Sequence, residues 1–120
     1  MKKTIILLLT TLFFACSEKD IQFSLDEVNF GDVKPVSVHE KLFYLRNLSG
    51  FTVSIDSIYS GCSCTKVELE DQFIKPFDSI EVYLRFESRN RPGNMVKSFT
   101  VYEKNSALTC SIRCNVLSNF

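Results

Sequence analysis

The sequence predicts an all-β protein built as a single immunoglobulin-like antiparallel β-sandwich of about seven strands. In several short segments apolar and polar residues alternate with a period of two, as in strands with one buried face. Clusters of Gly, Pro, Asn and Ser separate these segments at intervals of roughly ten residues, which is typical of turns. No segment carries a sustained helical period of apolar residues.

Seven segments have the composition of strands. The clearest example is residues 51–56, where Phe51, Val53 and Ile55 alternate with polar side chains directly after the turn-forming residues 47–50. The expected strands are residues 21–25, 28–33, 38–46, 51–55, 80–86, 96–103 and 108–116.

The first fifteen residues have the pattern of a bacterial secretory signal. Two lysines precede an apolar stretch of about eleven residues, well short of the ~20 that a helix needs to span a bilayer. The stretch from Leu12 to Cys16 resembles a lipobox, although Phe13 replaces the usual leucine. In lipoproteins the cysteine thiol receives a diacylglyceryl group and the new amino terminus is acylated, for example with palmitate. We therefore expect lipidation of Cys16; the alternative is an ordinary secreted protein in which this thiol is spare.

Processing at Cys16 divides the chain into three parts. Residues 1–15 form the signal peptide, residues 16–20 form the lipidated cysteine with a short polar tether, and residues 21–120 form the domain. The mature chain keeps twelve basic and fourteen acidic side chains, without a basic stripe, which excludes nucleic acid as a partner. The expected location is the bacterial cell envelope, anchored to the outer membrane by lipid. The expected partners are the membrane and another envelope protein.

The order of several motifs resembles a bacterial family of unknown function whose members are often short lipoproteins. That family carries a Cys-Gly-Cys-Thr motif, so Ser63 replaces the middle glycine here, and Phe77 stands where the family has glycine. The resemblance covers residues 26–117 and implies an immunoglobulin fold of the Hydin and major-sperm-protein type. It implies an envelope location and no particular reaction. The matching segments are Phe30-Gly31-Asp32-Val33, Phe43-Tyr44-Leu45-Arg46-Asn47, Val53-Ser54-Ile55, Gly61-Cys62-Ser63-Cys64-Thr65, Pro76-Phe77-Asp78-Ser79, Val82-Tyr83-Leu84-Arg85-Phe86 and Arg91-Pro92-Gly93.

The Cys62-Ser63-Cys64 segment is the sharpest candidate site. On an extended chain, Cys62 and Cys64 point the same way about 6.5–7 Å apart, and a tight turn at Gly61 would bring them closer. Such thiolates chelate a soft metal ion, copper or (with further ligands) zinc, or they form a redox disulfide. Lys66 is the nearest cation in sequence that would lower a thiol pKa. The structural alternative, packing residues or half of a structural disulfide, is preferred because a second ligand pair is missing.

The other two cysteines fall within one expected strand. Cys110 and Cys114 share its apolar face and are ~13 Å apart, too far to bridge each other. Any disulfide that they form would go to Cys62 or Cys64. The preferred interpretation is that both are small buried hydrophobic residues.

The sequence offers no convincing catalytic pair, so we predict that the protein is not an enzyme. His39 is the only histidine and lies in a polar stretch, where a surface position is expected. Glu68, Glu70 and Asp71 are expected to form a solvated acidic turn. Motifs for serine hydrolases, zinc proteases and phosphate binding are missing.

The expected function is therefore a lipid-anchored, non-enzymatic envelope domain. It would bind or scaffold a partner through a sheet edge or through its loop tips. No cofactor is predicted. The alternative is a soft-metal (copper or zinc) or thiol-redox module that uses Cys62 and Cys64.

Overall fold

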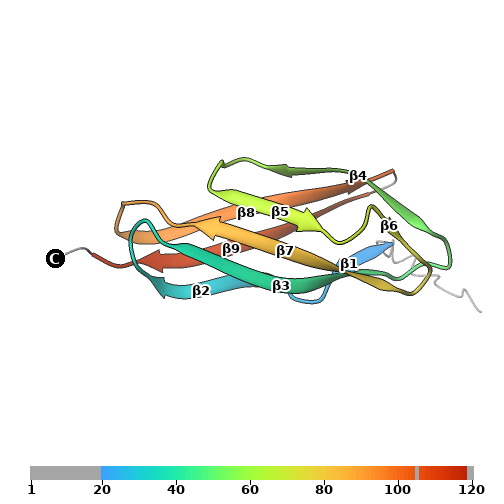
Figure 1. The fold of residues 1–120 in the computed structure, drawn as a ribbon, viewed down its shortest axis with the longest axis horizontal. Coiled ribbons are helices and arrows are strands. Elements are labelled where there is room, and N and C mark those ends of the chain that lie inside the picture. Colours follow the sequence, from blue (N-terminus) through green and yellow to red (C-terminus); the bar gives the residue numbers. More distant parts are fainter. Residues whose placement is uncertain (1–19, 105, 119–120) are drawn as a thin grey trace, which may run out of the picture.

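The computed structural model describes residues 20–104 and 106–118. Its strands form two packed sheets, so the predicted all-β sandwich is confirmed (Figure 1). The predicted signal peptide and the predicted lipidation site, Cys16, lie outside the described residues. Within those residues there is no helix long and apolar enough to cross a bilayer. The strands are β1 (Ile21–Phe23), β2 (Glu27–Val33), β3 (Val38–Asn47), β4 (Val53–Ser60), β5 (Thr65–Leu69), β6 (Phe73–Ile74), β7 (Ser79–Glu87), β8 (Gly93–Glu103) and β9 (Ala107–Val116).

The core lies between the two sheets and is built mainly from Ile, Val and Leu side chains, with phenylalanine rings that contact one another across the sheets. One sheet has the strand order β1-β3-β7-β5, and the other has the order β2-β9-β8-β4-β6. Phe23 and Phe43 from the first sheet meet Phe99 from the second, with centroids 5.5 to 6.3 Å apart. Phe86 stacks on Phe30 at 5.8 Å, again across the sheets. Alternating inward residues of both sheets therefore share one core, as a sandwich requires.

The strand count and one pairing differ from the sequence prediction. The structure adds β5 and the two-residue β6, and β4 continues past Ile55 to Ser60. β2 pairs in parallel with β9, whereas an antiparallel sandwich was expected. The β2–β9 register shifts between Asn29 and Asp32, where Gly31 has a φ of 67°. Glycine adopts this left-handed conformation without steric cost, so it permits the irregularity.

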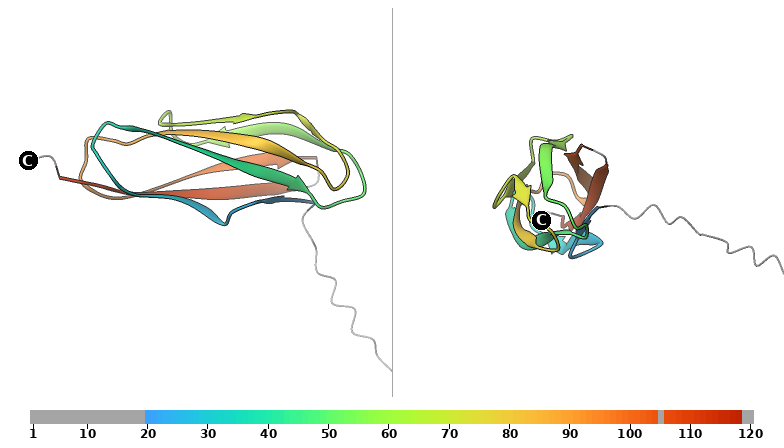
Figure 2. Two further views of the ribbon diagram at one scale, coloured as in Figure 1. Left: turned by 60° about the horizontal axis from the view of Figure 1, so that its bottom comes forward. Right: turned by 90° about the vertical axis from the view of Figure 1, so that its right-hand side faces the viewer.

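Loops gather at the two ends of the sandwich (Figures 1 and 2). We call one end, on the right in Figure 1, the tether end because the described chain begins there at Asp20, whose carbonyl accepts a hydrogen bond from Leu48 N at 2.7 Å. It comprises Asp20 and loops 48–52 and 75–78. We call the opposite end the cysteine end; it comprises loops 34–37, 61–64 and 88–92.

Candidate functional site

Residues 61–64 carry the chain from one sheet to the other at the cysteine end. β4 belongs to the five-stranded sheet and β5 to the four-stranded sheet. In this crossover Cys62 and Cys64 are joined by a disulfide, with their Cα atoms 5.1 Å apart. The crossover turns sharply, since Thr65 N donates to Cys62 O at 3.2 Å. The chain is therefore not extended here, and a tight turn, the alternative to the extended geometry, brings the two cysteines together.

The disulfide lies beside a cation that the sequence did not indicate. Arg89, in the β7–β8 loop, donates from Nη2 to Cys62 Sγ at 3.2 Å. Cys64 is buried, and its carbonyl accepts from Glu87 N at 2.8 Å, which fixes the crossover to the end of β7. Cys62 is only half-buried. A hollow of about 250 Å³ opens at this place, lined by Val36, Ser63, Cys64, Glu87, Ser88, Arg89 and Asn90.

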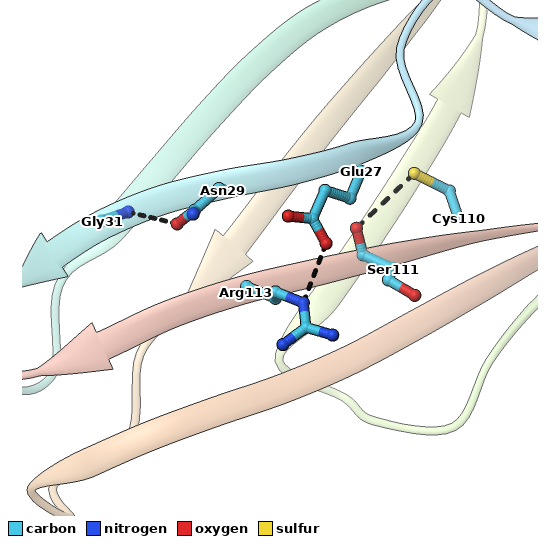
Figure 3. A network of polar contacts seen from close by, with 6 residues as sticks. All are labelled: Glu27, Asn29, Gly31, Cys110, Ser111 and Arg113. Carbon is cyan, nitrogen blue, oxygen red and sulfur yellow. Dashed lines mark hydrogen bonds and ion pairs between the residues drawn. The ribbon is translucent and has the colours of Figure 1, made fainter.

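Cys110 and Cys114 do not join this site. Both are free thiols buried in β9, on the apolar face that the sequence predicted for them. Burial raises the pKa of Cys110 to about 11 and also raises the pKa of Cys114. The thiol of Cys110 points to Ser111 O at 3.7 Å, close to the exposed ion pair of Arg113 with Glu27 at 2.8 Å (Figure 3). The four cysteines therefore do not converge, and the preferred interpretation of this pair as buried hydrophobic residues fits the structure.

The zinc prediction for Cys62 and Cys64 requires further ligands, whereas the copper prediction does not. Within residues 20–104 and 106–118, no group of three or more His, Cys, Asp or Glu side chains is arranged to hold a metal ion. A metal would also require the disulfide to be reduced first, because thiolates are the ligands. Metal binding at this pair stays a prediction.

Hydrogen bonds among Ser37, His39 and Ser88 hold the β2–β3 loop in place near the disulfide. His39 Nε2 lies 2.7 Å from Ser37 Oγ, and the half-buried ring packs 5.4 Å from Phe30. A serine nucleophile would have to direct its hydroxyl proton at the histidine. Here both Ser37 Oγ and the buried Ser88 Oγ donate to Lys34 O, at 2.6 and 2.7 Å. The cluster therefore holds a loop in place and is not set for catalysis.

The outer edges of β4 and β5 face each other across an opening between the sheets, which we call the seam. Among the described residues, β5 pairs with β7, and β4 beyond Ser54 pairs with β8. The seam is closed at one end by Ile55 N, which donates to Gln72 O at 2.8 Å. It is closed at the other end by Ser60 Oγ, which donates to Thr65 O at 3.2 Å. Between these contacts the backbone edges of residues 56–59 and 66–71 are open.

The seam combines apolar walls with an acidic rim. Ile58 and Leu69 are half-buried and pack against the core from its two sides. Asp56, Glu70 and Asp71 are exposed around them. The hollow measures about 620 Å³ and is lined by Ile55, Asp56, Ser57, Ile58, Leu69, Glu70, Asp71 and Gln72.

The acidic residues near Leu69 lie partly in a turn, as predicted. Glu70 and Asp71 follow β5 and are exposed, but Glu68 lies within β5. Glu70 Oε2 accepts from Glu81 N at 2.8 Å, and Asp71 Oδ1 accepts from Phe73 N at 3.1 Å. These carboxylates therefore also fix the backbone beside the seam.

At the tether end, Asn47 is a buried hub that joins two loops. Its Nδ2 donates to the carbonyls of Phe51, Ile74 and Lys75 at 2.6, 3.0 and 3.1 Å. Its Oδ1 accepts from Ser49 N and Ser49 Oγ at 2.9 and 2.7 Å. The asparagine that ends the Phe43–Asn47 motif thus holds loop 48–52 against loop 75–78.

Phe77 occupies a backbone position that favours glycine. Asp78 N donates to Lys75 O at 3.1 Å, so Lys75 to Asp78 form a β-turn with Phe77 in its third position. Phe77 has a φ of 57°, in the left-handed region. A turn with a positive φ at this position normally takes glycine, which explains why the resembling family has glycine here.

Comparison with known proteins gives the family. The model of the family described as "Protein of unknown function (DUF1573)" matches residues 21–116. The chain belongs to this family. No curated protein matches it significantly in sequence.

Solved structures similar to this DUF1573 chain share its fold at low sequence identity. A protein of unknown function from Porphyromonas gingivalis W83 superposes with a TM-score of 0.67 at 8% identity, covering 80% of this chain and 46% of that one. The VesB protease of Vibrio cholerae gives 0.64 at 13% identity, covering 81% and 32%. The ASH/PapD-like domain 7 of human CEP192 gives 0.60 at 10% identity, covering 84% and 87%.

These likenesses agree with the immunoglobulin-like β-sandwich fold of the DUF1573 chain. The chain spans less than half of the Porphyromonas protein and about a third of the protease. Sequence identities this low support a shared fold only, because proteins with a β-sandwich fold have many unrelated functions.

Proposed function

We propose that the chain is a lipid-anchored binding domain of the bacterial cell envelope that captures an extended segment of a partner protein at the seam. The observation that carries this proposal is the pair of open strand edges, 56–59 and 66–71, on either side of a hollow with Ile58 and Leu69 in its walls. Open edges take up an extended peptide through main-chain hydrogen bonds, and a groove for alternate side chains adds selectivity.

The charge of the seam specifies the chemistry of the partner. Asp56, Glu70 and Asp71 are exposed on its rim. Carboxylates around an apolar groove favour a peptide with alternating apolar and basic residues and repel one with acidic residues. We therefore propose a partner segment that is extended, alternately apolar and basic.

Separate observations support the lipid anchor and the non-enzymatic role. The lipobox-like stretch ending at Cys16 supports lipidation and an outer-membrane location. A binding role is favoured over catalysis because the hydroxyls of Ser37 and Ser88 are directed at a backbone carbonyl rather than at His39. Mass spectrometry of the protein from a bacterial host tests the anchor: diacylglyceryl and palmitate mass on Cys16 is expected, and an unmodified Cys16 refutes it.

Synthetic peptides test the seam. The probes are alternating Val-Lys and Val-Glu peptides of equal length, and binding is followed by NMR amide shifts. We expect shifts confined to residues 56–59 and 66–71, and an affinity at least tenfold higher for Val-Lys. Ile58→Lys should abolish these shifts, whereas Leu42→Lys, on the exposed outer face of β3, should preserve them. Shifts elsewhere, or equal binding of both peptides, would refute the proposal.

A thiol-redox role is the second candidate, favoured by the contact of Arg89 with Cys62 Sγ at 3.2 Å. In this role a thiolate of a substrate dithiol attacks the Cys62–Cys64 bond and forms a mixed disulfide. The second substrate thiolate then releases Cys62 and Cys64 as a dithiol, and the substrate leaves oxidised. The Arg89 guanidinium would stabilise the developing Cys62 thiolate.

Exchange with a small dithiol separates this role from a structural disulfide. Arg89→Gln should slow reduction of the disulfide by dithiothreitol at pH 7, whereas Arg91→Gln in the same loop should not. Reduced protein titrated with Cu(I) or Zn²⁺ tests the metal prediction. Replacing Cys62 and Cys64 by serine should abolish exchange or metal uptake and leave peptide capture at the seam intact.

A further inference from the structure

Three large apolar side chains are exposed together at the tether end. Their exposed fractions are 39% for Leu48, 81% for Phe51 and 65% for Phe77. Leu48 and Phe51 lie in the β3–β4 loop and Phe77 lies in the β6–β7 turn. We call these three side chains the apolar tip. Exposed aromatic side chains concentrated on loops at one end of a domain are a feature of interaction surfaces.

The two loops that carry the tip are fixed to each other. Phe77 N donates to Ser49 O at 3.3 Å, and the Asn47 amide holds Phe51 O and Lys75 O at 2.6 and 3.1 Å. Phe77 is held at a φ of 57°, where glycine is favoured. A large apolar residue at a strained and solvent-exposed position does not serve stability, so its presence points to a contact outside the domain.

The tether places this tip next to the anchor. Asp20 O accepts from Leu48 N at 2.7 Å, so the first described residue lies against the loop that bears the tip. Three residues, 17–19, separate Cys16 from Asp20 in the sequence. Even a fully extended chain places Asp20 at most about 15 Å from Cys16. A lipid on Cys16 would therefore keep Asp20, and the loop that contacts it, within about 15 Å of the lipid attachment point.

We propose that the apolar tip inserts into the interfacial region of the membrane that holds the Cys16 lipid, so that the sandwich stands on its tether end. This inference rests on the proposed lipid anchor. Phe and Leu side chains bury favourably at the boundary of headgroups and acyl chains, and the exposed Lys75 beside the tip suits the headgroup layer. The insertion fixes the orientation of the domain and directs the cysteine end away from the bilayer.

Tryptophan reporters test the insertion cleanly because the chain contains no tryptophan. The mature chain, residues 16–120, is coupled through the Cys16 thiol to vesicles of phosphatidylcholine with a maleimide-headgroup lipid. Phe51→Trp and Phe77→Trp report on the tip. Val96→Trp, at an exposed site of β8 toward the cysteine end, is the matched control. Quenching by brominated acyl chains measures burial in the bilayer.

We expect brominated lipids to reduce the emission of Trp at 51 and 77 at least twofold, with a blue shift, and to leave Trp at 96 unchanged. Equal quenching at all three sites, or none at any site, would overturn the proposal. A blue shift that grows with protein concentration without vesicles would assign the tip to a second copy of this chain and also overturn it. Chemical coupling makes this test independent of lipidation in cells, so a failure of the anchor and a failure of the insertion are distinguishable.

Discussion

Replacing Asn47 should destabilise the domain more than any other single polar substitution that we describe. The side chain has no exposed surface and makes five hydrogen bonds. Asn47→Ala removes the donor from three carbonyls and the acceptor from Ser49. The bond to Ile74 O lies in the interior, where water does not replace the lost donor. The other bonds lie near the surface, where water partly replaces them.

The magnitude follows from this difference in burial. The interior bond and the cavity left by the buried amide together cost about 1–3 kcal/mol, and each half-buried bond costs about 0.5 kcal/mol. The loss in free energy of unfolding is then about 3–5 kcal/mol, a large part of the ~5–15 kcal/mol of a typical domain. Urea unfolding followed by far-ultraviolet circular dichroism measures it, with the slope against urea unchanged.

Two further variants make the test specific. Asn47→Asp keeps the oxygen for Ser49 but loses the donors, so it should cost at least as much as alanine. Asn115→Ala removes a single exposed bond to Asp32, at 3.1 Å, and should cost less than about 0.5 kcal/mol. A loss below about 1 kcal/mol for Asn47→Ala, or wild-type stability of Asn47→Asp, would refute the reasoning.

Two other predictions concern the turn and the buried thiols. Phe77→Gly should be about 1 kcal/mol more stable than Phe77→Ala in urea unfolding, because only glycine relieves the left-handed strain at this exposed site; equal stability would contradict the strain. Burial raises the pKa of Cys110 to about 11 in the folded protein. As the pH rises, this thiol therefore ionises first in the unfolded chain, which favours unfolding. The free energy of unfolding should fall by up to about 2 kcal/mol between about pH 9 and 11. Cys110→Ala should flatten this alkaline loss, and an unchanged pH profile would argue against it.

The sequence predicted seven of the strands and missed β5 and β6, for different reasons. β7 and β9 alternate buried and solvent-facing residues along most of their length, so composition alone located them. β5 also alternates, with Thr65 buried and Val67 and Leu69 half-buried. Its outward residues and the carboxylates after it are charged, and that charge is equally typical of a turn. A two-residue strand such as β6 leaves too few positions for any period.

The candidate sites depend on contacts between distant residues, which no local pattern reveals. The sequence singled out Cys62 and Cys64 but named Lys66 as the nearby cation, whereas the structure places Arg89 against Cys62. The Phe43–Asn47 motif was visible, but the role of Asn47 depends on carbonyls from a loop 27 residues away. The seam arises because two edges from different sheets meet.

The parallel pairing of β2 with β9 has a mechanical consequence. The chain enters at the right of Figure 1 and its C-terminal strand ends at the left. A force applied between Asp20 and Val116 pulls β2 and β9 along their length in opposite directions. All five register pairs from Glu27↔Ser111 to Val33↔Val116 then bear the load at once, rather than opening one after another. This geometry makes the domain a stiff link under tension, and its lifetime under load is set by its unfolding rate.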